Sequence, residues 1–345
     1  MQNTEKILTV VVPVYNTEKY MKRCLDSVLI DEVLDDVEIL IVNDGSTDNS
    51  MEIAREYQAK CPMTIRIIDK ENGGHGSTIN VGMREAIGKY LRVLDSDDWF
   101  NSEDYCTYVH RLKDETADVV LTNYRQEHVY ESKSVKLNYD GLVDGKQYIF
   151  DDLDMAILKG EYFVMATSTY RTEVLRQANF KLFEKTPYVD MQFNIFPVPF
   201  VNTFTFYELD IYRYFIGRAD QTVNLNSFIR NQDAHEKVVK SIIEFYQNES
   251  PKWSDLKREY IKLIIKYLLH THYTIYCLYD TKNKATAYTK IKDFDAWLYN
   301  ISPEIYLMMN EMTYIQYHRK TKFNFVKING VMFDKVFRKL ATLKR

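Results

Sequence analysis

The chain has 345 residues, of which 46% are hydrophobic and 27% charged, and its formal net charge is −4. This composition excludes a disordered chain, and the small net charge gives no support for a nucleic-acid partner. No uncharged apolar stretch reaches the roughly 18 residues of a membrane-spanning helix. The N-terminal residues lack a signal-peptide pattern, and the four cysteines are scattered as in a reducing compartment. We therefore expect a cytoplasmic protein.

The first half of the chain alternates between strand and helix patterns. Apolar, β-branched runs predict strands that are buried on both faces, and apolar residues spaced three and four apart predict helices between them. Strands are expected at residues 7–14, 37–44, 64–69, 90–95 and 117–124. Alternation of this kind predicts an α/β fold, Rossmann-like, with a mainly parallel central sheet flanked by helices.

The second half has a different pattern. From about residue 130 we expect a hairpin, a short helix near Asp152, and a strand followed by a helix at 165–177. After about residue 233 the pattern is mostly helical, so we place a boundary between a domain of residues 1–230 and a helical region of residues 231–345.

The end of the chain is basic. Residues 320–345 carry eight Lys and Arg side chains and one acid, Asp334, among large apolar side chains. Two interpretations stay open, a contact with an anionic membrane surface and a solvated helix docked on the protein body.

Polar clusters follow four of the expected strands, and they read "PVYN" (13–16), "NDGSTD" (43–48), "DKENGGHG" (69–76) and "DSDD" (95–98). Ligands of open α/β sheets bind beyond the carboxyl ends of the strands, so these clusters should meet at one edge. Neither a P-loop nor a G-x-G-x-x-G motif after the first strand is present. The carboxylates of Asp44 and Asp95 suit hydrogen bonds to a base or ribose, and Asp97 suits a divalent metal that bridges a diphosphate. The sequence therefore predicts a nucleotide site built on carboxylates.

The segments "VVPVYN", "VNDGSTDNS", "NGGHGSTINVG" and "VLDSDDW" together resemble the nucleotide-sugar-binding half of family 2 glycosyltransferases, which have the GT-A fold. The resemblance covers about residues 6–125. It implies a Mn²⁺ or Mg²⁺ cofactor held by Asp97 of the D-x-D element, while Asp98 is expected to brace the loop against Arg84 or Arg92. The glycines imply a close backbone approach to the donor. The implied contacts to the nucleotide sugar are Pro13, Val14, Tyr15, Asn16, Asp44, Gly73, Gly74, His75, Gly76, Asp95 and Ser96.

The resemblance also implies an inverting reaction, in which a base removes a proton from the acceptor hydroxyl. The family's base is usually the Asp of an E-D pair that opens a helix, and Asp190 in "EKTPYVDMQFN" matches it, with Val189 in place of Glu. Glu184 is the alternative base, and helix capping is the alternative role of Asp190. Arg213 and Arg218, in a segment that resembles the family's Tyr-Arg element, are candidates for diphosphate contacts or for surface ion pairs.

The implied function is the transfer of a single hexose or N-acetylhexosamine from a UDP-sugar, because the processive Q-x-x-R-W signature is absent. The acceptor stays open between a lipid-linked glycan of surface-polysaccharide assembly and a protein-linked glycan. We expect the helical region to form an acceptor site or a homodimer contact, and the basic end to dock at the inner face of the plasma membrane. A sugar-phosphate nucleotidyltransferase would need a basic glycine-rich loop after the first strand, which is missing. A non-catalytic sugar-nucleotide-binding protein is disfavoured by the retained carboxylates.

Overall fold

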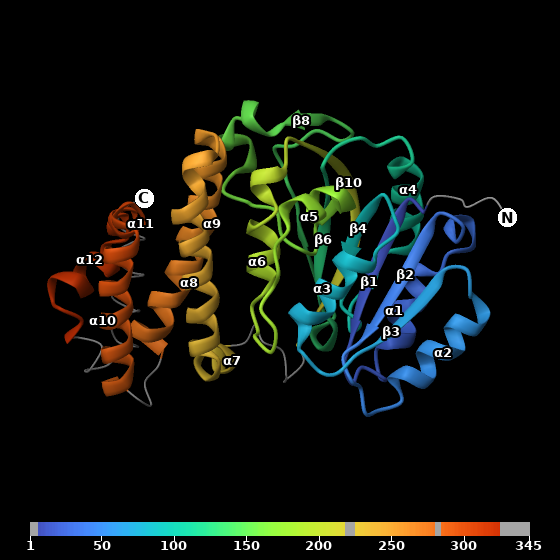
Figure 1. Ribbon diagram of the computed structural model, residues 1–345, viewed down its shortest axis with the longest axis horizontal. Coiled ribbons are helices and arrows are strands. Elements are labelled where there is room, and N and C mark those ends of the chain that lie inside the picture. Colours follow the sequence, from blue (N-terminus) through green and yellow to red (C-terminus); the bar gives the residue numbers. More distant parts are fainter. Residues whose placement is uncertain (1–5, 218–224, 280–283, 325–345) are drawn as a thin grey trace. The chain divides into compact units, whose positions relative to one another are not determined.

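The computed structural model describes residues 6–217, 225–279 and 284–324 (Figure 1). It divides into two compact units, Met1–Ala219 and Asp220–Arg345. The first unit contains the sheet, and the second is helical in its described part. The two units divide at residues 219/220, about ten residues before the boundary near residue 230 that we expected from the sequence, and the second unit's first described helix is α7 (Leu225–Arg230).

The strands of the first unit form one sheet with the order β3-β2-β1-β4-β9-β6-β10-β5, and β7 and β8 pair with β6 and β10. Figure 1 shows β3, β2, β1 and β4 side by side, as their pairing requires. The strands are β1 (Leu8–Val14), β2 (Val37–Asn43), β3 (Ile65–Asp69), β4 (Tyr90–Val93), β5 (Trp99–Phe100), β6 (Val119–His128), β7 (Lys133–Leu137), β8 (Gln147–Ile149), β9 (Ser168–Arg171) and β10 (Thr203–Ile216).

The five expected strands correspond to β1, β2, β3, β4 and β6, and the first four of these pair in parallel. The expected parallel part of the sheet is thus confirmed, but the whole sheet is mixed, because β5, β7, β8 and β9 pair antiparallel with their neighbours. Strand β9 runs antiparallel between β4 and β6. Strand β10, which is parallel to β6, was not expected from the sequence. Its side chains are partly exposed and its register shifts between Tyr207 and Tyr212, so it lacks the continuous apolar run that marks the other strands.

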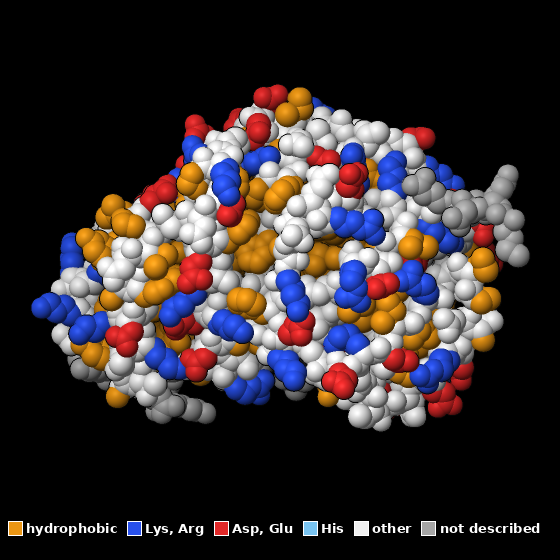
Figure 2. Space-filling view, viewed as in Figure 1, with side chains coloured by type: hydrophobic (Ala, Val, Ile, Leu, Met, Phe, Trp, Pro, Cys, Tyr) orange, Lys and Arg blue, Asp and Glu red, His pale blue; other side chains and the backbone are white. Residues whose placement is uncertain are grey.

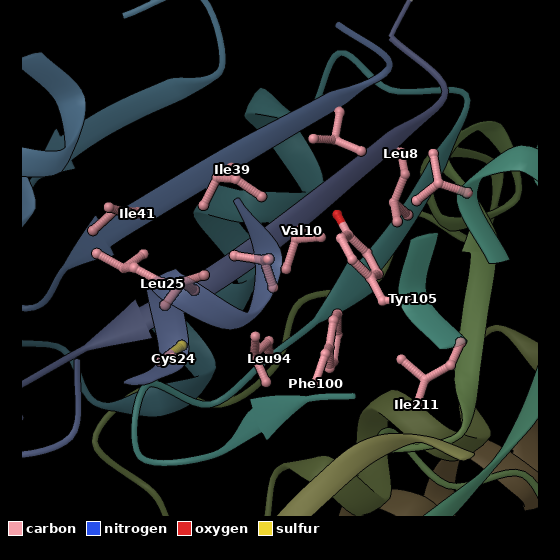
Figure 3. Close-up of a cluster of buried hydrophobic side chains, with 14 of the residues drawn as sticks. Leu8, Val10, Cys24, Leu25, Ile39, Ile41, Leu94, Phe100, Tyr105 and Ile211 are labelled. Carbon is pink, nitrogen blue, oxygen red and sulfur yellow. The ribbon is translucent and has the colours of Figure 1, made fainter. Parts of the chain in front are cut away.

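The core lies against both faces of β1. Its even-numbered side chains, among them Val10 and Val12, belong to a buried cluster with α1 (Met21–Val28), α2 (Ser50–Lys60) and α4 (Ser102–Leu112), part of which Figure 3 shows. On the opposite face Val11 lies so close to Gly82 of α3 (His75–Glu85) that a Cβ at Gly82 would collide with it. Side chains alternate across a strand, so β1 is covered by helices on both faces, and all its residues are buried.

The irregular part of the first unit contains the expected hairpin, formed by β6 and β7. A 3-10 turn, η3 (Phe150–Asp152), stands at the expected short helix, and β9 leads into α5 as expected. The remaining helices and 3-10 turns of this unit are η1 (Asp31–Val33), η2 (Val129–Glu131), η4 (Met155–Leu158), α5 (Thr172–Ala178), α6 (Asp190–Ile195) and η5 (Val198–Phe200).

The second unit packs its helices around buried aliphatic and aromatic side chains, and its helices α8 and α9 lie side by side (Figure 1). After α7 its elements are α8 (Gln232–Glu249), η6 (Ser250–Lys252), α9 (Asp255–Thr274), the π-helical η7 (Ile275–Tyr279), α10 (Lys284–Ile301), α11 (Pro303–Met308), η8 (Met309–Glu311) and α12 (Thr313–Lys320). Among the described helices, none is long and apolar enough to cross a membrane. Most of the basic end, from residue 325 onward, lies outside the described residues.

The surface carries both signs of charge. Figure 2 shows Lys and Arg side chains interspersed with Asp and Glu over the drawn face. This distribution agrees with the small net charge.

Candidate active site

The loops that follow the first four parallel strands meet through hydrogen bonds at one edge of the sheet. The N–H of Thr47, after β2, donates to Asn16 Oδ1, after β1, over 2.8 Å. The N–H of Gly73, after β3, donates to Asp44 Oδ1 over 2.8 Å. His75 Nε2 lies 2.7 Å from Asp95 Oδ1, on the loop after β4. The convergence of the four polar clusters that the sequence predicts is therefore confirmed.

Asp44 holds the glycine-rich loop in place. Its side chain is almost fully buried and accepts hydrogen bonds from the N–H groups of Gly73 and Gly74, over 2.8 and 2.7 Å, and from Lys70 Nζ over 2.7 Å. The Ser77 hydroxyl adds a fourth contact at 3.3 Å. An ionised carboxylate offers about four lone-pair sites, so these partners leave little capacity for a nucleotide base. In this structure Asp44 shapes the loop.

The glycines of this loop allow another segment of the chain to pack closely on it. Gly74 has a φ of +80°, which favours glycine, and the Gly73 carbonyl accepts a hydrogen bond from Lys185 N–H. A Cβ at Gly76 would collide with the carbonyl oxygen of Phe183. The sequence predicts that the glycines allow a close approach of the donor; the structure adds a close approach of residues 182–186.

This segment is further tied down on both sides. Asn80 of α3 makes two hydrogen bonds of 2.9 Å with the backbone of Leu182, and Gln192 Oε1 accepts from Phe183 N–H over 3.1 Å. Asp190 follows the segment as the first residue of α6. Its position is therefore set by the start of α3, more than a hundred residues earlier in the chain.

Asp190 is half-buried, and its pKa is raised above the usual value of an aspartate. Burial raises the pKa of Asp190, His75 offsets part of this rise, and the charge of Asp95 adds to it. Hydrogen bonds from the backbone of Asp190 and Met191 lower the pKa of this carboxyl in part, and the N-cap of α6 is Val189, which makes no side-chain capping bond. A carboxylate with a raised pKa beside other charged groups is typical of a general base. Glu184 fits less well, because it is exposed and its hydrogen bond with Lys181 lowers its pKa.

Asp98 points inward and braces the acidic loop. It is fully buried and accepts hydrogen bonds from the Tyr212 hydroxyl over 2.6 Å and from Phe215 N–H over 2.8 Å. The bracing role is thus confirmed, but the partners that we expected, Arg84 and Arg92, are wrong. Arg84 pairs with the neighbouring Glu85, and Arg92 donates to Thr122, Thr169 and the Ala166 carbonyl inside the core.

A second brace, missed in the sequence, comes from helix α1. The guanidinium of Arg23 donates to the Asp97 carbonyl over 2.9 Å and lies 3.7 Å from the ring centroid of Trp99. It also lies 5.1 Å from the ring centroid of Phe215, at the end of β10. Arg23 therefore joins α1, the acidic loop and β10. The sequence signal for Tyr212 was present, since it precedes Arg213 in the Tyr-Arg element, but nothing in the sequence marks Arg23.

The remaining residues that we expected to contact the nucleotide sugar differ in their surroundings. Pro13 and Val14 are strand residues paired with Val42 and Asn43, whereas Tyr15, beyond the strand end, is 52% exposed. Ser96 is buried. The Arg213 guanidinium pairs with Glu127 over 3.1 Å, which is the ion-pair alternative, and Arg218 lies outside the described residues.

The acidic loop can be tested for a divalent metal through its donor atoms. No group of three or more His, Cys, Asp or Glu side chains in residues 6–217, 225–279 and 284–324 is arranged to hold a metal ion. Mg²⁺ and Mn²⁺ prefer oxygen ligands, and such ions are often held by one or two carboxylates together with substrate phosphates. The half-buried Asp97 on this loop fits that second kind of site.

The mixed sheet, with an acidic loop and a glycine-rich loop at its carboxyl edge, defines the GT-A class of nucleotide-sugar-dependent folds. The structure of S. aureus TarS 1–349 in complex with UDP-GlcNAc is similar, with a TM-score of 0.66 over 93% of this chain and 90% of the TarS 1–349 chain, at 19% sequence identity. At this identity the similarity concerns the fold.

The sequence profile described as "Glycosyl transferase family 2" matches residues 9–176, so this part of the chain is a glycosyltransferase domain of family 2. The putative glycosyltransferase EpsH of Bacillus subtilis is 42% identical over 120 residues, which cover 35% of this chain and 34% of EpsH. The glycosyltransferase GlyA of Streptococcus pneumoniae is 39% identical over 117 residues, 34% of this chain and 16% of GlyA. The hyaluronan synthase of Pasteurella multocida is 38% identical over 125 residues, 36% of this chain and 13% of the synthase. The chain thus matches only a part of each relative's length.

Proposed function

We propose that this chain transfers a single hexose or N-acetylhexosamine from a UDP-sugar to an acceptor hydroxyl, with inversion at the anomeric carbon. The observation that carries the proposal is that Asp95 and Asp97 stand on one loop, with Asp190 near enough to Asp95 for its charge to raise the Asp190 pKa. The UDP-GlcNAc and UDP complexes of TarS support a UDP-sugar as donor. The match to hyaluronan synthase supports a role in surface polysaccharide or glycoconjugate assembly.

The nucleoside would lie along the sheet edge that Tyr15, Asn16 and the loop 73–76 form. Tyr15 is exposed just beyond β1 and offers an aromatic face for stacking on a base. Asp44 contributes through the shape of the loop that it fixes, and Asp95 accepts from the ribose. Arg213 is held by Glu127, so we do not assign it to the diphosphate.

Asp97 would hold Mn²⁺ or Mg²⁺ together with the diphosphate oxygens. Such an ion offsets the negative charge that develops on the departing UDP. Crowding of carboxylates in residues 95–98 is then tolerable, because Asp98 is turned into the core and bonded by Tyr212.

Asp190 would act as the base. Its carboxylate takes the proton from the acceptor hydroxyl as that oxygen forms a bond to the anomeric carbon, and the bond from this carbon to the diphosphate oxygen breaks. UDP leaves with the bonding electron pair. The acceptor stays open between a lipid-linked and a protein-linked glycan. The location of the reaction at the inner membrane face, through residues 320–345, is part of the proposal.

Thermal melting with nucleotides tests the binding half of this proposal. We expect UDP with Mn²⁺ to raise the melting temperature of the wild-type protein more than CDP or GDP with Mn²⁺. Asp97→Ala should lose most of the metal-dependent part of the shift, whereas Asp114→Ala, at an exposed position just after α4, should keep it. A wild-type protein that UDP and metal leave unshifted would contradict the proposal.

A further inference from the structure

His75 belongs to the glycine-rich loop, but its side chain contacts a carboxylate of the acidic loop, residues 95–98. It is the first residue of α3, and its Nε2 lies 2.7 Å from Asp95 Oδ1. Its side chain is 35% exposed and that of Asp95 28%, so the pair lies at the surface of the site with part of each group withdrawn from water. A protonated imidazole at this distance makes a charge-assisted hydrogen bond to the carboxylate.

The position of His75 relative to Asp190 is fixed by the backbone around both residues. Lys185 N–H donates to the Gly73 carbonyl, and Gly76 packs directly on the Phe183 carbonyl. The start of α3 and the segment before α6 are therefore fastened to each other on both sides of His75. Neither residue can move away from the other without breaking these contacts.

His75 and Asp190 each affect the pKa of the other. Burial lowers the pKa of His75, but the charge and hydrogen bond of Asp95, together with the charges of Asp190 and Asp97, raise it above its ordinary value overall. In the other direction, the presence of His75 offsets part of the rise that burial causes in the pKa of Asp190. An imidazolium at this position thus favours the ionised form of Asp190.

We propose that His75 is a positioning residue of the transfer reaction, which holds the Asp95 carboxylate by its Nε2–H and places a positive charge beside Asp190. The inference rests on the proposed function and assigns His75 a role other than a direct donor contact. A direct contact would make His75 matter for the affinity of the UDP-sugar. A positioning role makes it matter for the rate at which the bound UDP-sugar reacts.

The test separates hydrogen bonding from charge. His75→Gln can keep an N–H donor near the place of Nε2 but carries no charge, and His75→Leu removes both. His110→Gln, at an exposed histidine on α4, is the matched control. The readouts are the Kd of UDP with Mn²⁺ by calorimetry, and kcat and KM for UDP release without acceptor, from the UDP-sugar that the wild type hydrolyses fastest.

For His75→Gln we expect a Kd of UDP and a KM within about threefold of the wild type, and a kcat lower by roughly tenfold or more, since a well-placed general base contributes about 100-fold or more. His75→Leu should lower kcat further and weaken UDP binding, because Asp95 loses its partner. His110→Gln should match the wild type. If His75→Leu does not fold, as judged by its melting curve, the Gln variant alone decides.

Two results would overturn the inference while leaving the proposed function intact. One is a His75→Gln variant with wild-type kcat and a raised KM and Kd, which is the signature of a direct donor contact. The other is a wild-type kcat in both His75 variants. A wild-type protein that neither binds UDP nor releases it from any UDP-sugar overturns the proposed function, and this inference with it.

Discussion

The hydroxyl of Tyr212 donates a hydrogen bond of 2.6 Å to the carboxylate of Asp98, which lies 114 residues earlier in the chain. This bond joins β10 to the acidic loop and divides the three carboxylates of that loop by role. Asp98 is fully buried, whereas Asp95 and Asp97 keep part of their surface toward solvent. The loop is therefore supported from inside the protein by one carboxylate, while the other two stay partly exposed.

Tyr212→Phe should destabilise the protein. The change leaves a buried carboxylate oxygen without its hydroxyl donor, at an expected cost of about 1–3 kcal/mol in the free energy of unfolding. Urea denaturation measures this. Tyr105→Phe is the control, since the Tyr105 hydroxyl is buried with no hydrogen-bond partner in the described part of the chain, and its removal should be neutral or slightly stabilising. Equal stabilities of the two variants would contradict the bracing role.

Arg23→Met should weaken metal-dependent UDP binding more than it weakens the fold. Arg23 holds the Asp97 carbonyl and stacks on Trp99, so its loss frees the loop that carries Asp97, the residue that we propose as metal ligand. We expect a Kd of UDP with Mn²⁺ raised by about tenfold, or roughly 1.4 kcal/mol. Lys22→Met, at the exposed neighbouring position on α1, should bind as the wild type does. Similar affinities for both variants would show that the loop does not depend on Arg23.

Asp190→Asn should abolish most of the sugar transfer while UDP binding is retained. The amide cannot accept the proton of the acceptor hydroxyl, and loss of a general base costs about 10²- to 10⁴-fold in rate. The rate of UDP release and the Kd of UDP, measured on the same sample, separate the two effects. Glu184→Gln, at the alternative base, should keep the wild-type rate because Glu184 is exposed and paired with Lys181. The opposite pattern would move the base to Glu184.

As the pH is lowered, the rate of sugar transfer should begin to fall at a higher pH than it would with an ordinary aspartate as base. The base is active when ionised, and burial raises the pKa of Asp190, so protonation inactivates it at a higher pH than the usual Asp value of about 3.9. A profile of kcat/KM against pH, taken with stability monitored at each pH, should show an acidic limb above that value. An acidic limb at or below about 3.9 would contradict the environment assigned to Asp190.

The parallel part of the fold was accessible from the sequence because each of its strands is buried on both faces. Continuous apolar runs such as residues 7–14 can hardly be mistaken, and ligand-bearing loops follow from the strand direction. Strand β10 was missed for the opposite reason, since it is partly exposed and irregular in register. The antiparallel insertion of β9 depends on contacts between segments far apart in the chain, which local patterns do not carry.

The sequence predicts which residues lie at the edge of the sheet better than it predicts the contacts among them. Residue type placed Asp44, Asp95 and Asp98 at the sheet edge, but whether a carboxylate faces a ligand or a backbone N–H depends on three-dimensional packing. Asp44 faces Gly73 and Gly74, and Asp98 faces Tyr212. A single sequence likewise gives no reason to connect Arg23 with residues 95–99. These contacts appear only when the loops are folded onto one another.

Release of UDP from a panel of UDP-hexoses and UDP-N-acetylhexosamines, with Mn²⁺ or Mg²⁺ and with chelator, tests the central claim most directly. The account predicts that the wild-type protein releases UDP from at least one of these donors in the presence of metal. Chelator and Asp97→Ala should each stop the release, and Asp114→Ala should leave it unchanged. No release from any UDP-sugar, or a release that neither chelator nor Asp97→Ala affects, would contradict the account.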